Sequence, residues 1–246
     1  MALYDQIGQG YRTTRRSDPE INRQIAEALV GATDIVNIGA GAGSYEPPHI
    51  KLVAVEPSSV MIAQRPLAAH PVVQAAAEDL PFADQSFSHA LAVLSMHHWH
   101  DKKRAFQEVR RVARDRFVAL TYVPDAVSFW LTADYFPEIN ENDRAIFPTL
   151  ADLEAFFGPL TVTPLMVPEG CMDGFLGAFW KRPEAYLSPR IRAGISAFSA
   201  LSSLQEGLDK LQRDLESGVW HSRYSHLAEA TELDVGYRLV SIDLGR

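Results

Sequence analysis

The sequence predicts an α/β fold, in which a mostly parallel β-sheet is covered by helices on both faces. Short apolar runs alternate with segments of helical periodicity through the first half of the chain, which is the pattern of strand–helix–strand units. The first run leads into a turn with three alternating glycines, and the second run ends in an acidic residue, Glu56. Ligands of parallel sheets bind at the carboxyl ends of the strands, so both features are expected at a ligand-binding edge.

Local sequence signals predict the elements of the first half. A helix is expected to begin at Ser17–Glu20, where a capping side chain precedes a proline and an acid, and to end at Gly31. Ser58 and Asp101 are expected to cap two further helices. Strands are predicted at residues 34–38, 51–55, 71–75, 88–95 and 116–122. Because strands and helices alternate, the sheet is expected to be buried on both faces.

The second half is mainly helical in pattern. The expected elements are a helix capped by Thr149 over residues 150–157, an edge strand at 161–167, a long helix from Ser188 to Leu215 and a final strand at 237–242. The strand at 161–167 is placed at an edge because it contains Pro164, which a central strand does not tolerate.

The glycine-rich turn is the most informative segment of the chain. Residues 34–45 read D-I-V-N-I-G-A-G-A-G-S-Y, and the glycines allow a ligand to approach the backbone closely. A carboxylate at Glu56 can accept hydrogen bonds from both hydroxyls of a ribose. Together the two features predict a site for an adenosine-containing cofactor. NAD is a poor match, because its motif needs a third glycine where this chain has Ser44, and Glu46–Pro48 leaves room for little more than one turn of phosphate-binding helix.

The alternating glycines resemble the first motif of the class I S-adenosylmethionine-dependent methyltransferases. The segment from Ala77, A-E-D-L-P-F followed by S-F and an apolar strand ending in S-M-H-H-W-H-D, is similar to the type 11 methyltransferase family. The resemblance covers residues 1 to about 120, with the motifs in the family's order and spacing. It implies a Rossmann-like, doubly wound sheet of seven strands that binds S-adenosyl-L-methionine. It also implies one domain over residues 1–246, in which 1–122 form the cofactor-binding core and 123–246 supply a helical substrate lid and the last two strands.

The resemblance assigns cofactor contacts to four strand ends and to the N-terminal arm. They are Asn37, Gly39, Ala40, Gly41, Gly43, Glu56, Pro57, Ala77, Glu78, Asp79, Ser95, Met96, Tyr11 and Arg16. Asn37 departs from the family pattern, which has an acidic residue there. Its amide oxygen still accepts a hydrogen bond from the methionine ammonium, without the charge that strengthens such bonds. Tyr11 and one of Arg15 and Arg16 are expected to fold over the cofactor, the alternative being an exposed terminal arm.

Two histidines at the end of the fourth strand are the candidate catalytic bases. A histidine titrates near neutral pH, so His97 or His98 can take a proton from an acceptor. A structural role is the alternative for each of them, with one ring bonded to the loop backbone and Trp99 packed beneath the loop. No metal site is expected, because strand alternation separates these histidines from His100 and no acidic or thiol partner lies at ligand spacing.

Three aromatic residues after the fifth strand are the candidate substrate contacts. Phe129, Trp130 and Tyr135 are expected to line an apolar acceptor pocket, because the loop that carries them rims the cleft. The alternative is that they form the ordinary core of the helices in the second half.

Composition narrows the function further. The net charge is −8 and no basic run is present, which argues against a nucleic-acid partner. No apolar stretch is long enough to span a membrane and no secretory pattern is present, so a cytoplasmic protein is expected. We expect an enzyme, monomeric or homodimeric, that transfers a methyl group to a small organic acceptor by in-line displacement. An NAD-dependent oxidoreductase and a cofactor-binding protein without catalysis are the alternatives.

Overall fold

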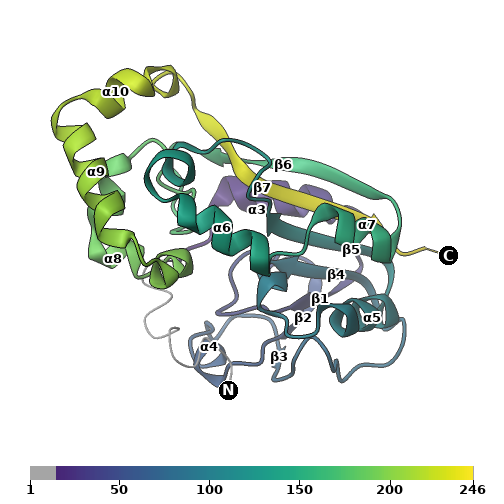
Figure 1. Cartoon of the computed structure of the whole chain (residues 1–246). Coiled ribbons are helices and arrows are strands. Elements are labelled where there is room, and N and C mark those ends of the chain that lie inside the picture. The colour runs from purple at the N-terminus through teal and green to yellow at the C-terminus, as the bar shows by residue number, and fades with distance from the viewer. Residues whose placement is uncertain (1–14, 246) are drawn as a thin grey trace.

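A seven-stranded sheet forms the centre of the protein (Figure 1). The computed structural model describes residues 15–245, and the strand order within them is β3-β2-β1-β4-β5-β7-β6. The strands are β1 (Asp34–Ile38), β2 (Lys51–Val55), β3 (Val72–Val73), β4 (Phe87–Val93), β5 (Ala113–Tyr122), β6 (Leu160–Pro168) and β7 (Glu232–Asp243). The first five strands pair in parallel, and β7 is antiparallel to both β5 and β6. The predicted α/β fold with a mostly parallel, seven-stranded sheet is confirmed.

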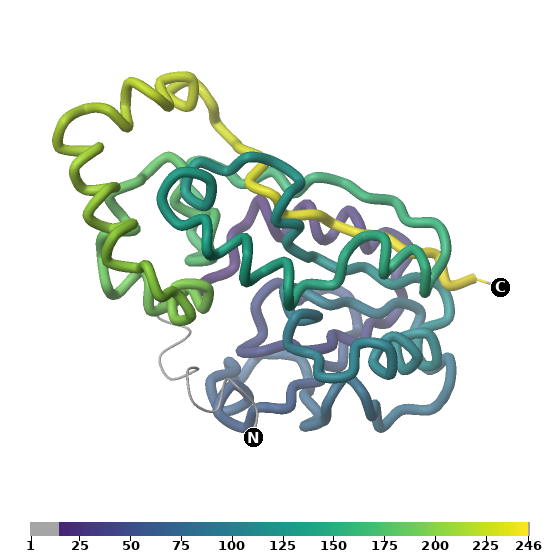
Figure 2. The backbone as a smooth tube through the Cα atoms, in the orientation of Figure 1, coloured from purple at the N-terminus to yellow at the C-terminus, as the bar shows by residue number. Residues whose placement is uncertain are grey.

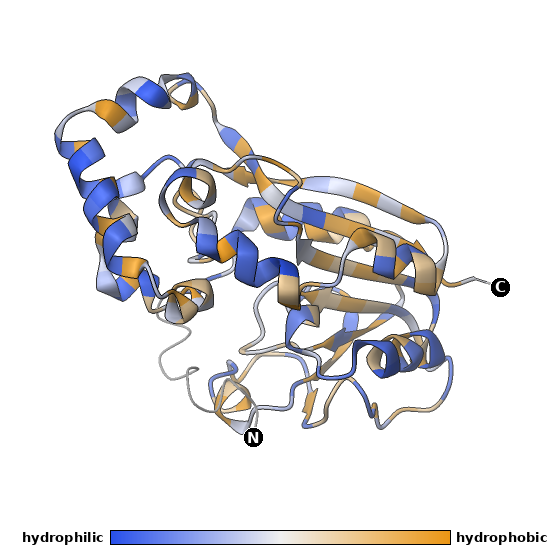
Figure 3. Cartoon of the chain, in the orientation of Figure 1, coloured by the Kyte–Doolittle hydropathy of each residue, from blue (hydrophilic) through white to orange (hydrophobic). Residues whose placement is uncertain are grey.

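Helices cover both faces of the sheet, as predicted. Helix α3 (Pro19–Ala28) packs on one face, and α5 (Lys102–Val112) and α7 (Leu150–Phe157) pack on the other. Adjacent residues of β1 show the alternation: Ile35 belongs to the core that includes Ile21 of α3, whereas Val36 belongs to the core that includes Phe106 of α5. The strands are accordingly mostly hydrophobic, while the outer surfaces of α5 and α9 (Leu204–Glu216) are mostly hydrophilic (Figure 3).

The predicted helix starts agree with the hydrogen bonds at the helix N-termini. Asp18 accepts from the backbone N–H groups of Glu20 and Ile21 at the start of α3, and Asp101 accepts from that of Arg104 at the start of α5. Ser58 caps the short helix α4 (Ser59–Ile62), and Thr149 caps α7. Each cap satisfies a backbone donor that has no partner inside its own helix, which fixes where the helix begins.

The last strand is longer than the sequence predicted. Residues 237–242 were expected, and β7 instead runs from Glu232 to Asp243 between β5 and β6 (Figure 2). Strand β6 lies at the sheet edge as predicted, and its register shifts between Pro164 and Met166. The strand expected at 71–75 is shortened to two residues, because only Ala54 and Val55 of β2 pair with it.

The lid, which we define as residues 123–148 and 169–231, covers one end of the sheet (Figure 1). Besides α9, its α-helices among the described residues are α6 (Pro137–Ile146), α8 (Pro189–Arg192) and α10 (Val219–Arg223). The prediction of one long helix from Ser188 to Leu215 is wrong. It is divided into α8, a 3₁₀-helix at Ser196–Ala200 and α9, because the backbone is extended at Ile195 and Leu201. Glu138 of α6 then accepts hydrogen bonds from Ser202 and Ser203, which positions the start of α9.

The aromatic residues expected to line the acceptor pocket lie inside the lid instead. Phe129, Trp130 and Tyr135 are each at most 4% exposed, and they do not line the cavity described below. The Trp130 indole N–H donates to the carbonyl oxygen of Trp180, and its ring packs against Trp220. The prediction failed because the lid needs a core of its own, and these large rings supply it.

The ends of β1 and β4 meet at a point where only glycine fits. Gly39 has a φ of 73°, and a Cβ atom on it would lie 2.5 Å from the Cβ of Ser95. Ser95 is itself held, because its hydroxyl donates to the carbonyl oxygen of Ile38 at 2.7 Å. The glycine turn and the end of β4 are therefore in contact at one edge of the sheet.

Substitution of Gly39 by alanine should destabilise the fold. Overpacking costs about 1–3 kcal/mol and a left-handed backbone in a non-glycine residue about 1–2 kcal/mol. We therefore expect denaturant unfolding of Gly39→Ala to show a loss of about 2 kcal/mol or more. Gly170→Ala is the control, because its Cβ would meet no atom within 4 Å. Equal stability of the two variants would contradict the close contact.

Candidate active site

The loop between β1 and β2 is fixed by the end of β2. The N–H groups of Gly39 and Ala40 donate to the carbonyl oxygen of Val55 at 2.8 and 2.9 Å. The N–H of Gly41 donates to Oε2 of Glu56 at 2.8 Å, and the N–H of Ser58 donates to Oε1 at 2.9 Å. Glu56 thus joins the glycine turn to the start of α4. No helix lies between β1 and β2, both of which are fully described, so the loop has no helix N-terminus for a pyrophosphate.

Asn37 carries a buried acceptor atom without a donor. Its Nδ2 donates to Glu46 at 3.2 Å, and Glu46 forms an ion pair with Arg65 at 2.8 Å in which both side chains are 4% exposed. Oδ1 of Asn37 has no hydrogen-bond partner within residues 15–245, although the residue is only 1% exposed. An unsatisfied buried polar group costs about 1–3 kcal/mol. This atom is therefore placed to accept a hydrogen bond from a ligand.

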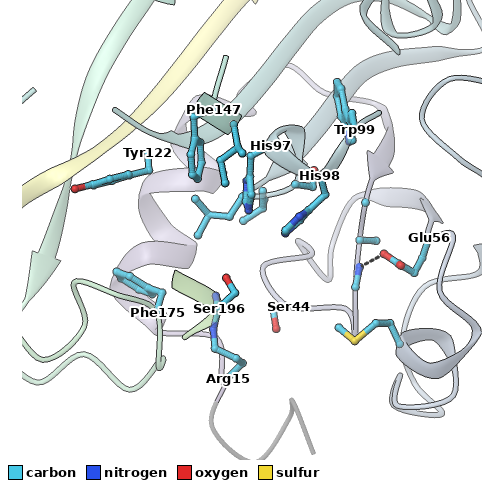
Figure 4. A pocket seen from close by; sticks show the side chains of 18 of the residues that line it. Arg15, Ser44, Glu56, His97, His98, Trp99, Tyr122, Phe147, Phe175 and Ser196 are labelled. Carbon is cyan, nitrogen blue, oxygen red and sulfur yellow. Dashed lines mark hydrogen bonds between the residues drawn. The ribbon is translucent and has the colours of Figure 1, made fainter. Parts of the chain in front are cut away.

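A cavity of about 1110 Å³ opens beside these strand ends. Figure 4 shows Glu56 at one end, the rings of Tyr122, Phe147 and Phe175 at the other, and His97 and His98 between them. We call the first end the polar end and the second the aromatic end. Pockets for single ligands usually measure about 300–1,000 Å³. The volume of this cavity is therefore sufficient for two small molecules at once.

Most of the predicted site residues contribute to the wall of this cavity. They are Asn37, Gly39, Ala40, Gly41, Glu56, Pro57, Ala77, Glu78, Ser95, His97 and His98. The carboxylate of Glu78 also accepts from the N–H groups of His100 and Asp101, so it holds the start of α5 in place. The sequence therefore identified the polar end of the cavity and both histidines in its middle.

Four of the predicted cofactor residues do not line the cavity, and a fifth, Tyr11, lies outside the described residues. Met96 is 1% exposed and packs into the core below the end of β4. Gly43 faces the guanidinium of Arg65, and Asp79 and Arg16 are exposed away from the wall. The family motifs located the strand ends that form the cavity. They could not show which of the residues next to these strand ends point away from the cavity.

Arg15 lines the cavity where Arg16 was expected. Its Nε lies 2.8 Å from Oδ1 of Asp173, and the Tyr45 hydroxyl donates to Oδ2 of the same carboxylate at 2.7 Å. Asp173 is 2% exposed and belongs to the lid. It therefore joins the lid to the N-terminal segment and to the glycine turn. Sequence reasoning missed Asp173, because its partners are 158 and 128 positions away and no local motif marks them.

The two histidines are half-buried in the cavity wall and favour the neutral form. Burial lowers the pKa of His98 to about 4, with a further contribution from the positive charge of Lys102. Burial also lowers the pKa of His97 well below its usual value, and the His97 ring stacks on Phe147 at 4.1 Å between centroids. Nδ1 of His97 has no partner within residues 15–245. A base whose conjugate acid is this strong is poorly matched to neutral pH, so a proton-accepting role is disfavoured for both.

The aromatic end contains one acidic group that the sequence analysis missed. Asp143 of α6 lines the cavity and is 7% exposed, and burial raises its pKa to about 7. Ile139, Asn142 and Ile146 line the cavity from the same helix. The spacing of three and four residues places these side chains and Asp143 on one face of α6. Asn142 and Asp143 between two isoleucines of that face could therefore have been recognised in the sequence as candidate site residues.

Comparisons with known proteins agree with this geometry. Residues 36–117 match the model of a family described as a methyltransferase domain. A crystal structure from Anabaena variabilis, described as a methyltransferase from an antibiotic biosynthesis pathway, is 31% identical and superposes with a TM-score of 0.84. That match covers 93% of this chain and 98% of the other.

Two more distant relatives share the fold or part of the sequence. A methyltransferase structure from Bacillus halodurans is 15% identical with a TM-score of 0.51, and the match covers 92% of this chain and 97% of the other, which shows the fold alone. Demethylmenaquinone methyltransferase of Thermotoga maritima is 26% identical over 141 residues. That match spans 50% of this chain and 62% of the relative's length.

The histidine environment predicts a pH effect on stability. Both folded pKa values lie below the ordinary value of 6.5, so protonation favours the unfolded chain. The stabilisation present above pH 6.5 should therefore be lost as the pH falls toward 4. In an NMR titration, the His98 ring, assigned with a His98→Asn variant, should stay neutral until the pH approaches 4. A midpoint near 6.5 would contradict the buried environment.

Proposed function

Because the chain belongs to the class I S-adenosylmethionine-dependent methyltransferases of the type 11 family, we propose that it methylates a small organic acceptor bound at the aromatic end of the cavity. The observation that carries this proposal is the continuity of the two ends. The polar end, at Asn37, Gly39 and Glu56, and the aromatic end, at Tyr122 and Phe147, line one cavity of about 1110 Å³.

The residues of the polar end fit S-adenosylmethionine. The unpartnered Oδ1 of Asn37 is suited to a donor such as the ammonium of an amino acid. Glu56 presents a buried carboxylate at the tip of β2, where two ribose hydroxyls can donate to it. The glycine turn itself forms part of the cavity wall, and its glycines allow it to pack closely against Ser95 and Met61. The cofactor, when bound, supplies a methyl group already activated as a sulfonium.

The chain's own part in the reaction is to hold the acceptor and exclude water. Positioning two reactants in a fixed geometry can supply about 7–11 kcal/mol of the barrier. The lid closes the aromatic end with Phe175, Ile195 and Ser196, and the Arg15–Asp173 ion pair joins the lid to the N-terminal segment. We propose that this compartment, lined mostly by apolar side chains, places the acceptor in line with the sulfonium.

The size and lining of the compartment favour a small molecule over a macromolecule. The aromatic end is formed by side chains of β5, β7 and the lid, and no basic run is present in the sequence. A nucleic acid would need a basic surface to neutralise its phosphates. None of the helices in residues 15–245 is long and apolar enough to cross a membrane.

The NAD-dependent alternative loses its structural basis. The loop that follows β1 lacks the helix whose N-terminus would hold a pyrophosphate. The family assignment agrees with this, because it makes the chain an S-adenosylmethionine-dependent enzyme.

Removal of the Glu56 carboxylate should weaken cofactor binding. Hydrogen bonds to charged groups contribute about 1.5–3 kcal/mol, so Glu56→Gln should reduce affinity for S-adenosylmethionine by about 10-fold or more. Glu56→Ala should reduce it further, because it also releases the N–H groups of Gly41 and Ser58. Calorimetric titration measures both affinities. Glu206→Gln, which removes an exposed carboxylate on α9, is the control, and unchanged affinity in Glu56→Gln would refute the ribose assignment.

A further inference from the structure

We infer that the acceptor is a ring-bearing amine whose nitrogen binds to the carboxyl group of Asp143, and that Asp143 takes a proton from it. This inference rests on the proposed function, because it requires the polar end to be filled by the cofactor. It assigns a role to a residue that the sequence analysis did not single out.

Asp143 faces the cavity from the lid. It lies on the face of α6 that lines the cavity, one turn from Ile139 and one turn from Ile146. Only 7% of the residue is exposed, and within the described part of the chain, residues 15–245, no hydrogen bond to its carboxyl group offsets the effect of burial on its pKa. A buried carboxylate without a partner is costly, so a ligand that supplies a donor or a positive charge is favoured there.

The cavity wall at the aromatic end is mostly apolar and rich in rings. Rings of Tyr122, Phe147, Phe175 and Tyr237 line the aromatic end, together with aliphatic side chains. The Tyr122 hydroxyl already donates to Asn140 at 3.0 Å. Flat apolar surfaces of this kind accept a ring, and aromatic faces also attract a nearby ammonium. The wall therefore suits a molecule with an apolar ring and one cationic group.

The charges of the side chains that line the cavity disfavour an acidic acceptor. Arg15 lines the cavity, but its guanidinium is paired with Asp173 at 2.8 Å. His97 and His98 are held in the neutral form by burial. A carboxylate acceptor would therefore meet Asp143 without an available cation among the groups that face it. An amine would neutralise Asp143 instead.

The groups around Asp143 also permit the proton transfer. The titratable groups that line the cavity with it are Tyr122 on β5, Tyr237 on β7, three histidines after β4 (His97, His98 and His100), Arg15, Tyr45, Glu56 at the polar end, and Glu78, while Ser196–Ala200 contributes none. Arg144, its neighbour on α6, pairs with Asp125 on the exposed side. Burial raises the pKa of Tyr122 and Tyr237, with that of Tyr122 near 12, so neither competes for the proton at neutral pH.

The chemistry balances without another reactant. The bound ammonium gives one proton to a carboxylate oxygen of Asp143, and the electron pair of that N–H bond stays on nitrogen. The nitrogen pair then forms the new bond to the methyl carbon, and the pair of the broken carbon–sulfur bond stays on sulfur. A carboxyl whose pKa is near 7 is matched to this exchange at neutral pH.

Calorimetric titration with three matched probes tests the inference. With S-adenosylhomocysteine bound, phenethylamine, phenethyl alcohol and phenylacetate are titrated into the wild-type protein at neutral pH. We expect the amine to bind about 10-fold or more tightly than the alcohol, because a charge-assisted contact replaces a neutral one, and phenylacetate to bind weakest. Addition of S-adenosylmethionine should then convert the amine to its N-methyl product, measured by mass spectrometry.

Two variants complete the experiment. Asp143→Asn should remove the preference for the amine over the alcohol, while Glu141→Gln, an exposed carboxylate on the same helix, should keep it. The fold is expected to tolerate Asp143→Asn, because burial already disfavours the ionised carboxyl. S-adenosylhomocysteine should bind Asp143→Asn as it binds the wild type.

The outcomes separate the inference from the proposed function. An unchanged amine preference in Asp143→Asn, phenylacetate binding as tightly as the amine, or no binding of any probe beside bound S-adenosylhomocysteine would overturn the inference alone. Failure of the wild-type protein to bind S-adenosylhomocysteine would overturn the proposed function.

Discussion

The attachment of the glycine turn to the end of β2 is the constraint on which the site depends. Val55 accepts hydrogen bonds from Gly39 and Ala40, and Glu56 accepts one from Gly41. Since Gly39 also touches Ser95 after β4, the ends of three neighbouring strands are brought to one point. The buried carboxylate of Glu56 and the unpartnered amide oxygen of Asn37 then lie beside the glycine turn. The polar end of the cavity follows from this local geometry, and it does not require a helix after β1.

The other end of the cavity is formed by different means. Asp173 ties the lid to Arg15 and Tyr45, and α6 presents Asp143 between isoleucines. Burial acts in opposite directions on the acid at this end and on the two histidines in the middle of the cavity. It lowers the pKa of His97 and His98 and raises that of Asp143, because in each case the charged form is disfavoured. Of these three groups, Asp143 is therefore the one whose pKa is moved toward neutral pH.

The sequence predicted the fold and the polar end well, because both depend on local signals. The β1–β2 turn, the caps at Asp18 and Asp101, and the strand-end position of Glu56 are all encoded within short segments. The lid was predicted poorly, because its structure depends on contacts between distant segments. Trp130 packs in the lid core against Trp220, and the long helix is broken where Glu138 binds Ser202 and Ser203. Helix periodicity cannot show such partners.

We propose that a single cavity holds the cofactor at its polar end and leaves its aromatic end open to the acceptor. A crystal structure with S-adenosylhomocysteine tests this claim most directly. We expect density for the ribose at Glu56 and for the amino-acid moiety at Asn37, with the space between Tyr122, Phe147 and Asp143 left free. Density for the nucleoside in that space, or at a site away from the glycine turn, would contradict the claim.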